Sequence, residues 1–517
     1  MQISKQAVGA GSELQGASLS VTHQDTTGAT VTDAQWVSGQ DATGAYSDTP
    51  HTLTTLAVNV TYTLTETTAP YGYAIAERIQ FRILENGDVQ AKPYGQPDSA
   101  FTTVDADTVL MLDKPTRALF SKKTLAADSA EQIGAHFTLT DLTPQAGQPQ
   151  TTWTWVSDGT PHEILAGLVG GHTYRLTETT PPAGYVAANP VTFTVSATGE
   201  LTSTDATGAT VDNSPATVNA ASETVTVRNA PTVLTIAKVD DQTPPQIVKN
   251  ATLTVYAASG AEATVPGAAV TTVSTGETGI ATVTGTLVMG QWYMVGEVTA
   301  PDGYLTAQTS APFQLAANGT AQISMTDALT LFRVAKKDAN TGALLAGATI
   351  AIYDSVMVDG VPQPDTTRQV ASVVTVAGEL TEIRGLLLNH TYYLYEAGAP
   401  DGYIRNRDLY TAFTINPDGS TAVYSVDQPT RVLFDKVDGN GDRVGGASLA
   451  LVTGTDTAYT EAEVVARWQS SATEPYAVEH LLIGQPYTLL ETEAPAGYTL
   501  NTAGVTFMES PWAWTMK

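Results

Sequence analysis

One phrase returns five times along this chain of 517 residues: YTLTETTAPYGY, YRLTETTPPAGY, YMVGEVTAPDGY, YYLYEAGAPDGY and YTLLETEAPAGY. Each copy holds a Glu followed by a Pro-x-Gly-Tyr turn, and successive glutamates lie 95 to 119 residues apart. A period of about 100 residues predicts tandem domains, each large enough to bury its own core. We therefore expect five modules, numbered 1 to 5, with the boundaries 1–115, 116–231, 232–328, 329–429 and 430–517.

The repeated phrase has the alternation of a β-strand. Residues two apart on a strand share a face, so Tyr62, Leu64 and Glu66 are expected to point to the same, apolar side. A buried carboxylate costs several kcal/mol unless it is paired or hydrogen-bonded. Two interpretations are open: a structural glutamate that accepts backbone amides, or a glutamate that takes part in a reaction. The five glutamates are Glu66, Glu178, Glu297, Glu396 and Glu491.

The composition favours short strands and argues against several classes of partner. Thr, Ala, Val and Gly are abundant, Pro punctuates the chain, and long helical patterns are absent, which is typical of all-β domains. Acidic residues number 52 against 24 basic ones, a net charge of −28 that disfavours nucleic acid and anionic membranes as partners. Cysteine is absent, so no disulfide forms. The sequence contains no run of 18 apolar residues, so we expect no membrane insertion within this chain.

Two further elements recur around each glutamate. Near the start of each repeat, a Lys follows an apolar residue by two positions, and the same alternation places both on one face. The first four repeats close with an alternating strand that ends in Asp or Asn, although Ser425 makes the fourth of these the weakest match. The opening lysines are Lys5, Lys122, Lys238, Lys336 and Lys436. The closing residues are Asp113, Asn229, Asp327 and Asp427.

The joins between repeats are short and constant in length. Each closing Asp or Asn is followed nine residues later by the opening Lys of the next repeat. Three of the four joins contain a proline, namely Pro115, Pro231 and Pro429. Short joins stiffened by proline predict modules held in fixed orientation, and hence a rod.

A Lys, a Glu and an Asp or Asn on the inner faces of three strands form either a buried salt-bridge cluster or a reactive site. Burial lowers the pKa of a lysine and raises that of a glutamic acid, so a neutral amine and a neutral acid can coexist. A neutral amine is a nucleophile, and a protonated Glu can polarise the acceptor carbonyl and shuttle protons. Loss of water from Asp, or of ammonia from Asn, would leave an amide cross-link.

The phrase Y-x-L-x-E-x-x-A-P-x-G-Y resembles the E-box of the SpaA-like, Cna protein B-type domains of Gram-positive surface proteins and pilins, and the resemblance covers essentially the whole chain. It implies β-sandwich modules of Ig-like or prealbumin-like fold. It also implies an intramolecular isopeptide bond from the opening Lys to the closing Asp or Asn, with the E-box Glu as catalyst. The implied sets are Lys5, Asp113 and Glu66; Lys122, Asn229 and Glu178; Lys238, Asp327 and Glu297; and Lys336, Asp427 and Glu396.

Module 5 departs from this pattern. It offers Lys436 and Glu491, but Trp512–Lys517 stands where an acceptor is expected, so no bond is predicted there. The pattern predicts that both ends of the sequence are cut, and neither a signal peptide nor a sorting motif is present. Module 3 departs in having Val295 where the phrase has Leu.

Other motifs carry little chemistry. The Asp438, Asn440 and Asp442 loop resembles the start of a calcium loop, but Arg443 and Leu449 replace its required Gly and Glu. The seven histidines have no metal-ligand spacing, and no cofactor fingerprint is present. We predict no metal and no cofactor. Two longer segments, 91–108 and 201–223, are interpreted as extra hairpins or insertions, with adhesive loops as the alternative.

The predicted function is the structural stalk of a bacterial cell-wall-anchored surface protein or pilin, located outside the cell and stiffened by isopeptide bonds. Expected partners are other pilin or surface-protein segments. The first alternative is an adhesin whose modules bind host extracellular matrix or glycan. The second, a prealbumin-type sandwich enzyme, would need a polar cleft with His or metal ligands. We expect no enzyme activity on an external substrate, because the cross-linking reaction consumes its own side chains.

Overall fold

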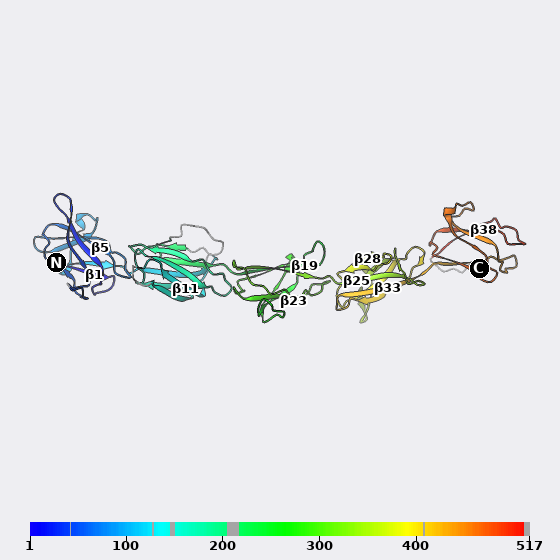
Figure 1. Cartoon of the computed structure of the whole chain (residues 1–517), viewed down its shortest axis with the longest axis horizontal. Coiled ribbons are helices and arrows are strands. Elements are labelled where there is room, and N and C mark those ends of the chain that lie inside the picture. The colour runs from blue at the N-terminus through cyan, green and yellow to red at the C-terminus, as the bar shows by residue number, and fades with distance from the viewer. Residues whose placement is uncertain (42, 127–128, 145–149, 204–216, 407–408, 511–517) are drawn as a thin grey trace.

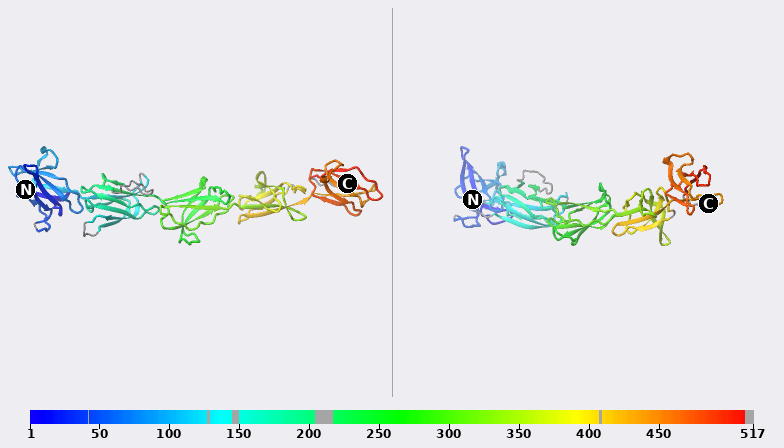
Figure 2. Two further views of the ribbon diagram at one scale, coloured as in Figure 1. Left: turned by 45° about the horizontal axis from the view of Figure 1, so that its top comes forward. Right: turned by 45° about the vertical axis from the view of Figure 1, so that its right-hand side comes forward.

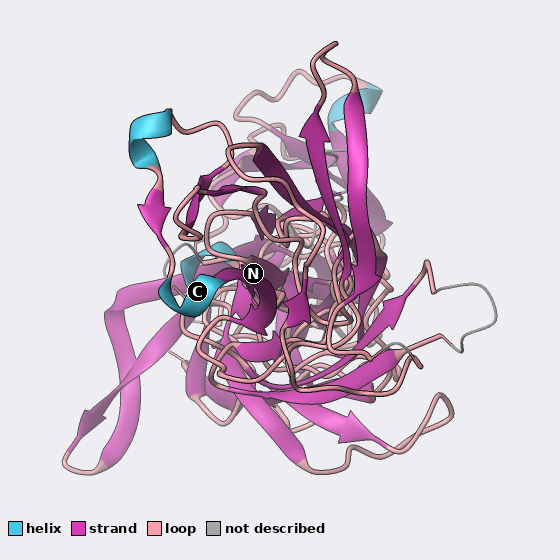
Figure 3. Ribbon diagram, turned by 90° about the vertical axis from the view of Figure 1, so that its left-hand side faces the viewer, coloured by secondary structure: helices cyan, strands magenta, loops and turns pink. Residues whose placement is uncertain are grey.

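The computed structural model is an elongated row of five β-rich modules with the two termini at opposite ends (Figure 1). Two further views show the same end-to-end order (Figure 2). Seen along the long axis, the regular structure is almost all strand, with four short helical turns (Figure 3). The structure describes residues 1–41, 43–126, 129–144, 150–203, 217–406 and 409–510.

The first two modules hold eighteen strands. Module 1 contains β1 (Gln2–Ala7), β2 (Ser18–Gln24), β3 (Thr30–Val37), β4 (His51–Thr52), β5 (Thr61–Thr68), β6 (Ile79–Ile83), β7 (Val89–Pro93), η1 (Asp98–Ala100), β8 (Thr102–Thr103), η2 (Asp105–Asp107) and β9 (Thr108–Asp113). Module 2 contains β10 (Arg117–Thr124), β11 (Ile133–Asp141), β12 (Thr152–Asp158), β13 (His162–Leu165), β14 (Thr173–Thr180), β15 (Val191–Val195), β16 (Leu201–Ser203), β17 (Thr217–Asn219) and β18 (Thr224–Asn229).

The last three modules are also built of β-strands. Module 3 contains β19 (Val233–Asp240), β20 (Thr252–Ala258), β21 (Ala269–Ser274), η3 (Gly276–Thr278), β22 (Ile280–Thr284), β23 (Trp292–Thr299) and β24 (Thr320–Asp327). Module 4 contains β25 (Leu331–Asp338), β26 (Leu344–Leu345), β27 (Thr349–Val358), β28 (Val361–Val374), β29 (Thr381–Arg384), β30 (Thr391–Gly398), β31 (Tyr403–Ile404), β32 (Thr411–Thr414) and β33 (Ser420–Pro429). Module 5 contains β34 (Arg431–Phe434), β35 (Ser448–Thr453), η4 (Glu461–Glu463), β36 (Val464–Gln469), β37 (Tyr476–Glu479), β38 (Pro486–Glu493) and β39 (Val505–Met508).

Each module is a sandwich of two sheets around its own apolar core, as the composition predicts. In module 3 the sheets have the strand orders β22-β19-β24 and β21-β20-β23. The E-box strand β23 lies in one sheet, and the opening and closing strands β19 and β24 pair in the other. Five separate clusters of buried apolar side chains fill the five modules. The all-β, tandem-sandwich prediction is confirmed.

The opening and closing strands of modules 1 to 4 pair in parallel, although they are far apart in the sequence. The pairs are β1 with β9, β10 with β18, β19 with β24, and β25 with β33. Module 5 lacks such a pair within the described residues, where β34 pairs only with β37. The chain therefore enters and leaves each of the first four modules along adjacent strands of one sheet.

The long segments of modules 1 and 2 add strands to the common plan. In module 1, β7 and β8 extend the E-box sheet, which has the order β3-β2-β5-β6-β7-β8. In module 2, β16 extends the E-box sheet and β17 pairs with the closing strand β18. Residues 204–216 of the predicted insertion lie outside the described residues. The described parts are thus extra strands, in line with the interpretation as hairpins.

Every join is held by the same buried threonine, three residues after the acceptor. Its amide donates to the glycine carbonyl of the Pro-x-Gly-Tyr turn in the preceding module, at 2.8 to 3.0 Å. Its hydroxyl donates to a leucine carbonyl of the following module, at 2.5 to 2.8 Å. We call this arrangement the threonine clip. The four threonines are Thr116, Thr232, Thr330 and Thr430.

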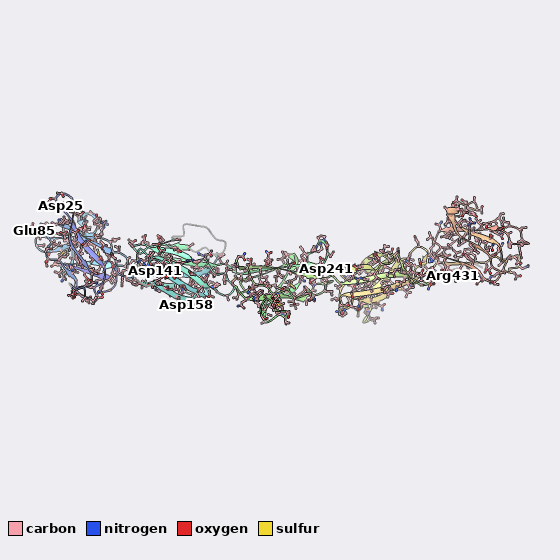
Figure 4. All side chains as sticks on the ribbon, viewed as in Figure 1. Asp25, Glu85, Asp141, Asp158, Asp241 and Arg431 are labelled. Carbon is pink, nitrogen blue, oxygen red and sulfur yellow. The ribbon has the colours of Figure 1, made fainter. Side chains whose placement is uncertain are left out.

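The glycine of each turn lies directly against the next module. A Cβ on Gly72, Gly184, Gly303 or Gly402 would lie 2.1 to 2.9 Å from a backbone oxygen of that module. At the join of modules 3 and 4, Asp241 adds an ion pair with Arg384 at 3.5 Å and lies beside this junction (Figure 4). The Pro-x-Gly-Tyr turns thus dock the neighbouring module through their glycines.

We expect Gly72→Ala to loosen the join of modules 1 and 2. Its Cβ would lie 2.1 Å from the Ala166 carbonyl oxygen, and no Cβ in a folded protein tolerates that approach. Because the chain contains no cysteine, paired spin labels on introduced cysteines in modules 1 and 2 can report the distance distribution, which should broaden. Gly497→Ala is the matched control: it has the same turn and a φ of +91°, with nothing within 4 Å among the described residues. An unchanged distribution in Gly72→Ala would contradict the docking role.

Candidate cross-linking sites

The structure brings together all four predicted Lys, Glu and acceptor sets. The Lys comes from the opening strand, the acceptor from the closing strand beside it, and the Glu from the facing sheet. The lysines and acceptors are at most 1% exposed, and the Glu side chains at most 2%. These twelve residues form four sites, which we call clusters 1 to 4.

Strand register explains why each Lys meets its acceptor. Lys5 is paired in register with Met111, so Asp113 lies two residues further along the parallel strand and on the same face. The same offset of two residues separates Lys122 from Asn229, Lys238 from Asp327, and Lys336 from Asp427. A lysine side chain spans this offset, whereas a shift by one residue would turn one partner to the opposite face.

Each lysine amine contacts both of its partners. The Nζ of Lys5, Lys238 and Lys336 contacts an oxygen of the acceptor Asp, and that of Lys122 contacts Asn229 Oδ1. The Nζ-to-Glu distances are 2.9 Å in cluster 1, 3.6 Å in cluster 2, 3.4 Å in cluster 3 and 2.8 Å in cluster 4. A nucleophile, an acceptor and a proton-transfer group therefore lie together in each of the four modules.

A backbone amide ten residues after each Glu fixes its carboxylate, a contact that the sequence analysis missed. The amide donates to Glu Oε2 at 2.5 to 2.9 Å in all five modules. The donors are Ala76, Ala188, Ala307, Asn406 and Asn501. Because the donor is a main-chain amide, no residue type in the sequence signals this contact. One oxygen is anchored as the structural interpretation expects, while the carboxylate still faces the lysine.

The acceptor aspartates are shifted towards their neutral form. Burial and the facing glutamate, against the opposing effect of the lysine, raise the pKa of Asp113, Asp327 and Asp427 to about 7. In cluster 1, Asp113 Oδ2 and Glu66 Oε1 are buried and have no hydrogen-bond donor among the described residues. Because an orphaned buried oxygen is costly, the neutral form of Asp113, which carries an O–H donor, is favoured there.

Cluster 2 presents the same arrangement with an amide in place of the acid. Asn229 Nδ2 donates to Glu178 Oε1 at 3.0 Å, so the carboxylate faces the group that would leave as ammonia. Burial lowers the pKa of Lys122 to about 8 and raises the pKa of Glu178. Both shifts favour the neutral amine and the neutral acid that the reaction needs.

Module 5 contains only part of a cluster among the described residues. Lys436 Nζ lies 3.4 Å from Glu491, and the Lys436 side chain is 23% exposed, against at most 2% for the other four lysines. The segment 511–517, where the pattern places no acceptor, lies outside the described residues. The absence of a bond in this module stays a prediction.

Two lysines that adjoin the clusters point away from them, as their register predicts. Lys123 lies 4.0 Å from Glu131 at the surface, and Lys337 Nζ stacks 3.8 Å from the ring centroid of Tyr424. In the Asp438 loop, the carboxylate accepts the amides of Asn440 and Asp442. Within the described part of the chain, no group of three potential metal ligands and no helix able to cross a bilayer is found.

The fold and its clusters define a class: tandem β-sandwich modules, of which the first four each have a buried lysine facing a carboxyl or amide across two parallel strands. The family model for the SpaA prealbumin-like fold domain matches residues 1–95, 119–210, 232–329, 331–429 and 430–509. The chain therefore belongs to the SpaA prealbumin-like domain family. No curated protein sequence matches it.

The solved structures that match this chain are distant from it in sequence. The TIE protein of Bacillus anthracis is 18% identical, with 76% of this chain and 71% of that chain covered and a TM-score of 0.31. A streptococcal ancillary pilin is 17% identical over 61% of this chain and 99% of its own, with a TM-score of 0.26. The pilus adhesin SpaC from Lactobacillus rhamnosus GG is 11% identical, with coverages of 81% and 57% and a TM-score of 0.29.

Proposed function

We propose that the chain is the stalk of a bacterial surface protein or pilin, cross-linked by four intramolecular isopeptide bonds. The bonds join Lys5 to Asp113, Lys122 to Asn229, Lys238 to Asp327, and Lys336 to Asp427, with Glu66, Glu178, Glu297 and Glu396 as the catalytic residues. The observation that carries this proposal is the buried contact of Lys with acceptor across the parallel opening and closing strands, four times over.

The chemistry follows from the position of the Glu carboxyl. The neutral amine attacks the acceptor Cγ, a C–N bond forms, and the bond from Cγ to the leaving oxygen or nitrogen breaks. The Glu takes a proton from the amine and returns one to the leaving group, which departs as water from Asp and as ammonia from Asn. The reaction happens once per module, because it consumes both side chains.

The bond positions suit a protein that carries tension. Tension along the chain enters module 1 through β1 and leaves through β9. A covalent bond between these two strands would carry that tension, so the packed core of the module would not have to resist it. From each acceptor to the next Lys is nine residues, so little of the chain lies outside a covalent loop. The threonine clips, with their paired contacts to both modules, support a rod of fixed module orientation.

The mass of the denatured, intact chain tests the proposal. Three Asp-derived bonds each remove about 18 Da and one Asn-derived bond about 17 Da, so a deficit of about 71 Da is expected. The control is the chain with alanine at Glu66, Glu178, Glu297 and Glu396, which should have the mass given by its sequence. A wild-type chain with no deficit would contradict the cross-links and remove the basis for the load-bearing stalk.

The remaining predictions concern partners and location. An extracellular position on the cell surface, and contacts with other pilin or surface-protein segments, accord with the family and with a stalk. Binding of host matrix protein or glycan, and an enzyme activity of prealbumin type, remain predictions that no feature of the described residues favours over the stalk.

A further inference from the structure

Ser425 distinguishes cluster 4 from the other three. The residue opposite the lysine on the closing strand is Met111 in module 1, Val227 in module 2 and Met325 in module 3. These three side chains are at most 3% exposed and offer no hydrogen-bond acceptor comparable to a hydroxyl. In module 4 the same position is Ser425, the residue that made this closing strand the weakest match in sequence.

The serine changes where the lysine amine directs its hydrogen bond. Lys336 Nζ donates to Ser425 Oγ at 2.9 Å. Neither carboxylate oxygen of Asp427 has a hydrogen-bond partner among the described residues, although Oδ1 is in ion-pair contact with the amine. In clusters 1 and 3, by contrast, the amine donates its hydrogen bond to the acceptor aspartate itself.

We propose that Ser425 slows cross-link formation in module 4 by directing an N–H of the Lys336 amine to its own hydroxyl instead of to Asp427. This inference rests on the proposed function, because it concerns the rate of the same reaction. An ammonium group has three N–H donors and no lone pair. Glu396 at 2.8 Å and Asp427 Oδ1 lie in ion-pair contact with this amine, but its hydrogen bond goes to Ser425 at 2.9 Å.

The step that Ser425 retards is the formation of the nucleophile. Attack needs the lone pair of Lys336 Nζ to face Asp427 Cγ, so one proton must pass from the amine to Glu396 and one N–H must turn away. The C–N bond then forms, the bond from Cγ to the hydroxyl oxygen breaks, and water departs with the proton of the aspartic acid and a proton from the amine. A serine that accepts an N–H from Lys336 opposes the turning of this amine that must come before the attack. Ser425 is thus a positioning residue.

The test compares modules within one molecule. The full chain, recovered unfolded in urea and diluted into buffer, is quenched at intervals and digested, and the cross-linked peptides of each module are quantified by mass spectrometry. Module 1 in the same sample is the internal reference. In the wild-type chain, the module 4 bond should form last among the three Asp-derived bonds.

Two reciprocal substitutions decide the role of Ser425. Ser425→Val should accelerate the module 4 bond about fivefold relative to module 1, because one hydrogen bond to the charged amine is lost. Ser425→Thr keeps the hydroxyl and should restore the wild-type rate, which a packing effect would not do. Met325→Ser should slow module 3 by a similar factor, and this variant remains informative if Ser425→Val misfolds.

The outcomes separate this inference from the proposed function. An unchanged or slower module 4 bond in Ser425→Val, or an unchanged module 3 bond in Met325→Ser, would overturn the role of Ser425 while the cross-links stand. If no cross-linked peptide arises from any module of the wild-type chain, the proposed function fails, and the role of Ser425 fails with it.

Discussion

Replacement of Glu66 by alanine should remove the module 1 cross-link and lower the unfolding temperature of that module by about 15 °C or more. The closed loop from Lys5 to Asp113 has a sequence separation of 108 residues. Closing a loop of about 100 residues removes on the order of 4–5 kcal/mol of unfolded-chain entropy, if disulfide arithmetic transfers. Differential scanning calorimetry of the full chain should show one new transition at lower temperature, and the intact mass should rise by about 18 Da relative to the mass expected for a fully cross-linked variant.

Glu13 provides a matched control for the loss of Glu66. It is a second buried glutamate beside the same lysine, but it accepts the Ser4 hydroxyl at 2.5 Å and the Lys5 backbone amide at 3.0 Å. Glu13→Ala should therefore keep the cross-link and lower the stability by about 1–3 kcal/mol, the cost of the lost hydrogen bonds. A Glu66→Ala chain that retained the full mass deficit would show that Glu66 is not the catalyst.

The pH dependence of bond formation should differ between the two kinds of cluster. In clusters 1, 3 and 4 burial raises the pKa of the acceptor Asp to about 7, and only the neutral acid is a good electrophile that loses water. As the pH rises above about 7, the loss of neutral acid offsets the gain in neutral amine, so the rate there should level off. In cluster 2 the amide is uncharged, and burial lowers the pKa of Lys122 to about 8. The reactive neutral amine accumulates as the pH rises, so that bond should form faster.

The measurement is the rate of cross-linked peptide formation in each module after dilution from urea at pH values from about 6 to 9. The chain contains its own comparison, since all four clusters react in one sample. Asn229→Asp should make the module 2 rate level off above about pH 7, and Asp327→Asn should make the module 3 rate keep rising. Parallel profiles in all four modules would contradict the assignment of the titrating groups.

The alternation of buried and exposed side chains along single strands could be predicted from the sequence, and the structure confirms it. Tyr62, Leu64 and Glu66 are each at most 3% exposed, as the E-box pattern predicts. The opening lysines and closing acceptors of modules 1 to 4 are buried for the same reason. A period of two residues needs only local geometry, and five copies of the phrase made the pattern visible.

Contacts between distant segments could not be predicted in this way. The parallel pairing of β1 with β9 brings Lys5 and Asp113 together across 108 residues, and alternation alone fixes neither the partner nor the register. The resemblance to a family implied the pairing. The backbone amide of Ala76 on Glu66, and the hydroxyl of Thr116 on Leu168, involve main-chain atoms that every residue has, so no residue type announced them.

The threonine clip has a consequence for how such a chain changes over generations. The amide of each clip threonine binds a turn glycine before it, its hydroxyl binds a leucine carbonyl after it, and the same pair of contacts recurs at all four joins. The same two contacts therefore serve all four joins. Recombination that duplicates or deletes a whole repeat of 95 to 119 residues would preserve this pair of contacts at the joins that remain. A lineage can thus change the length of the protein in steps of one module while it keeps the threonine clip.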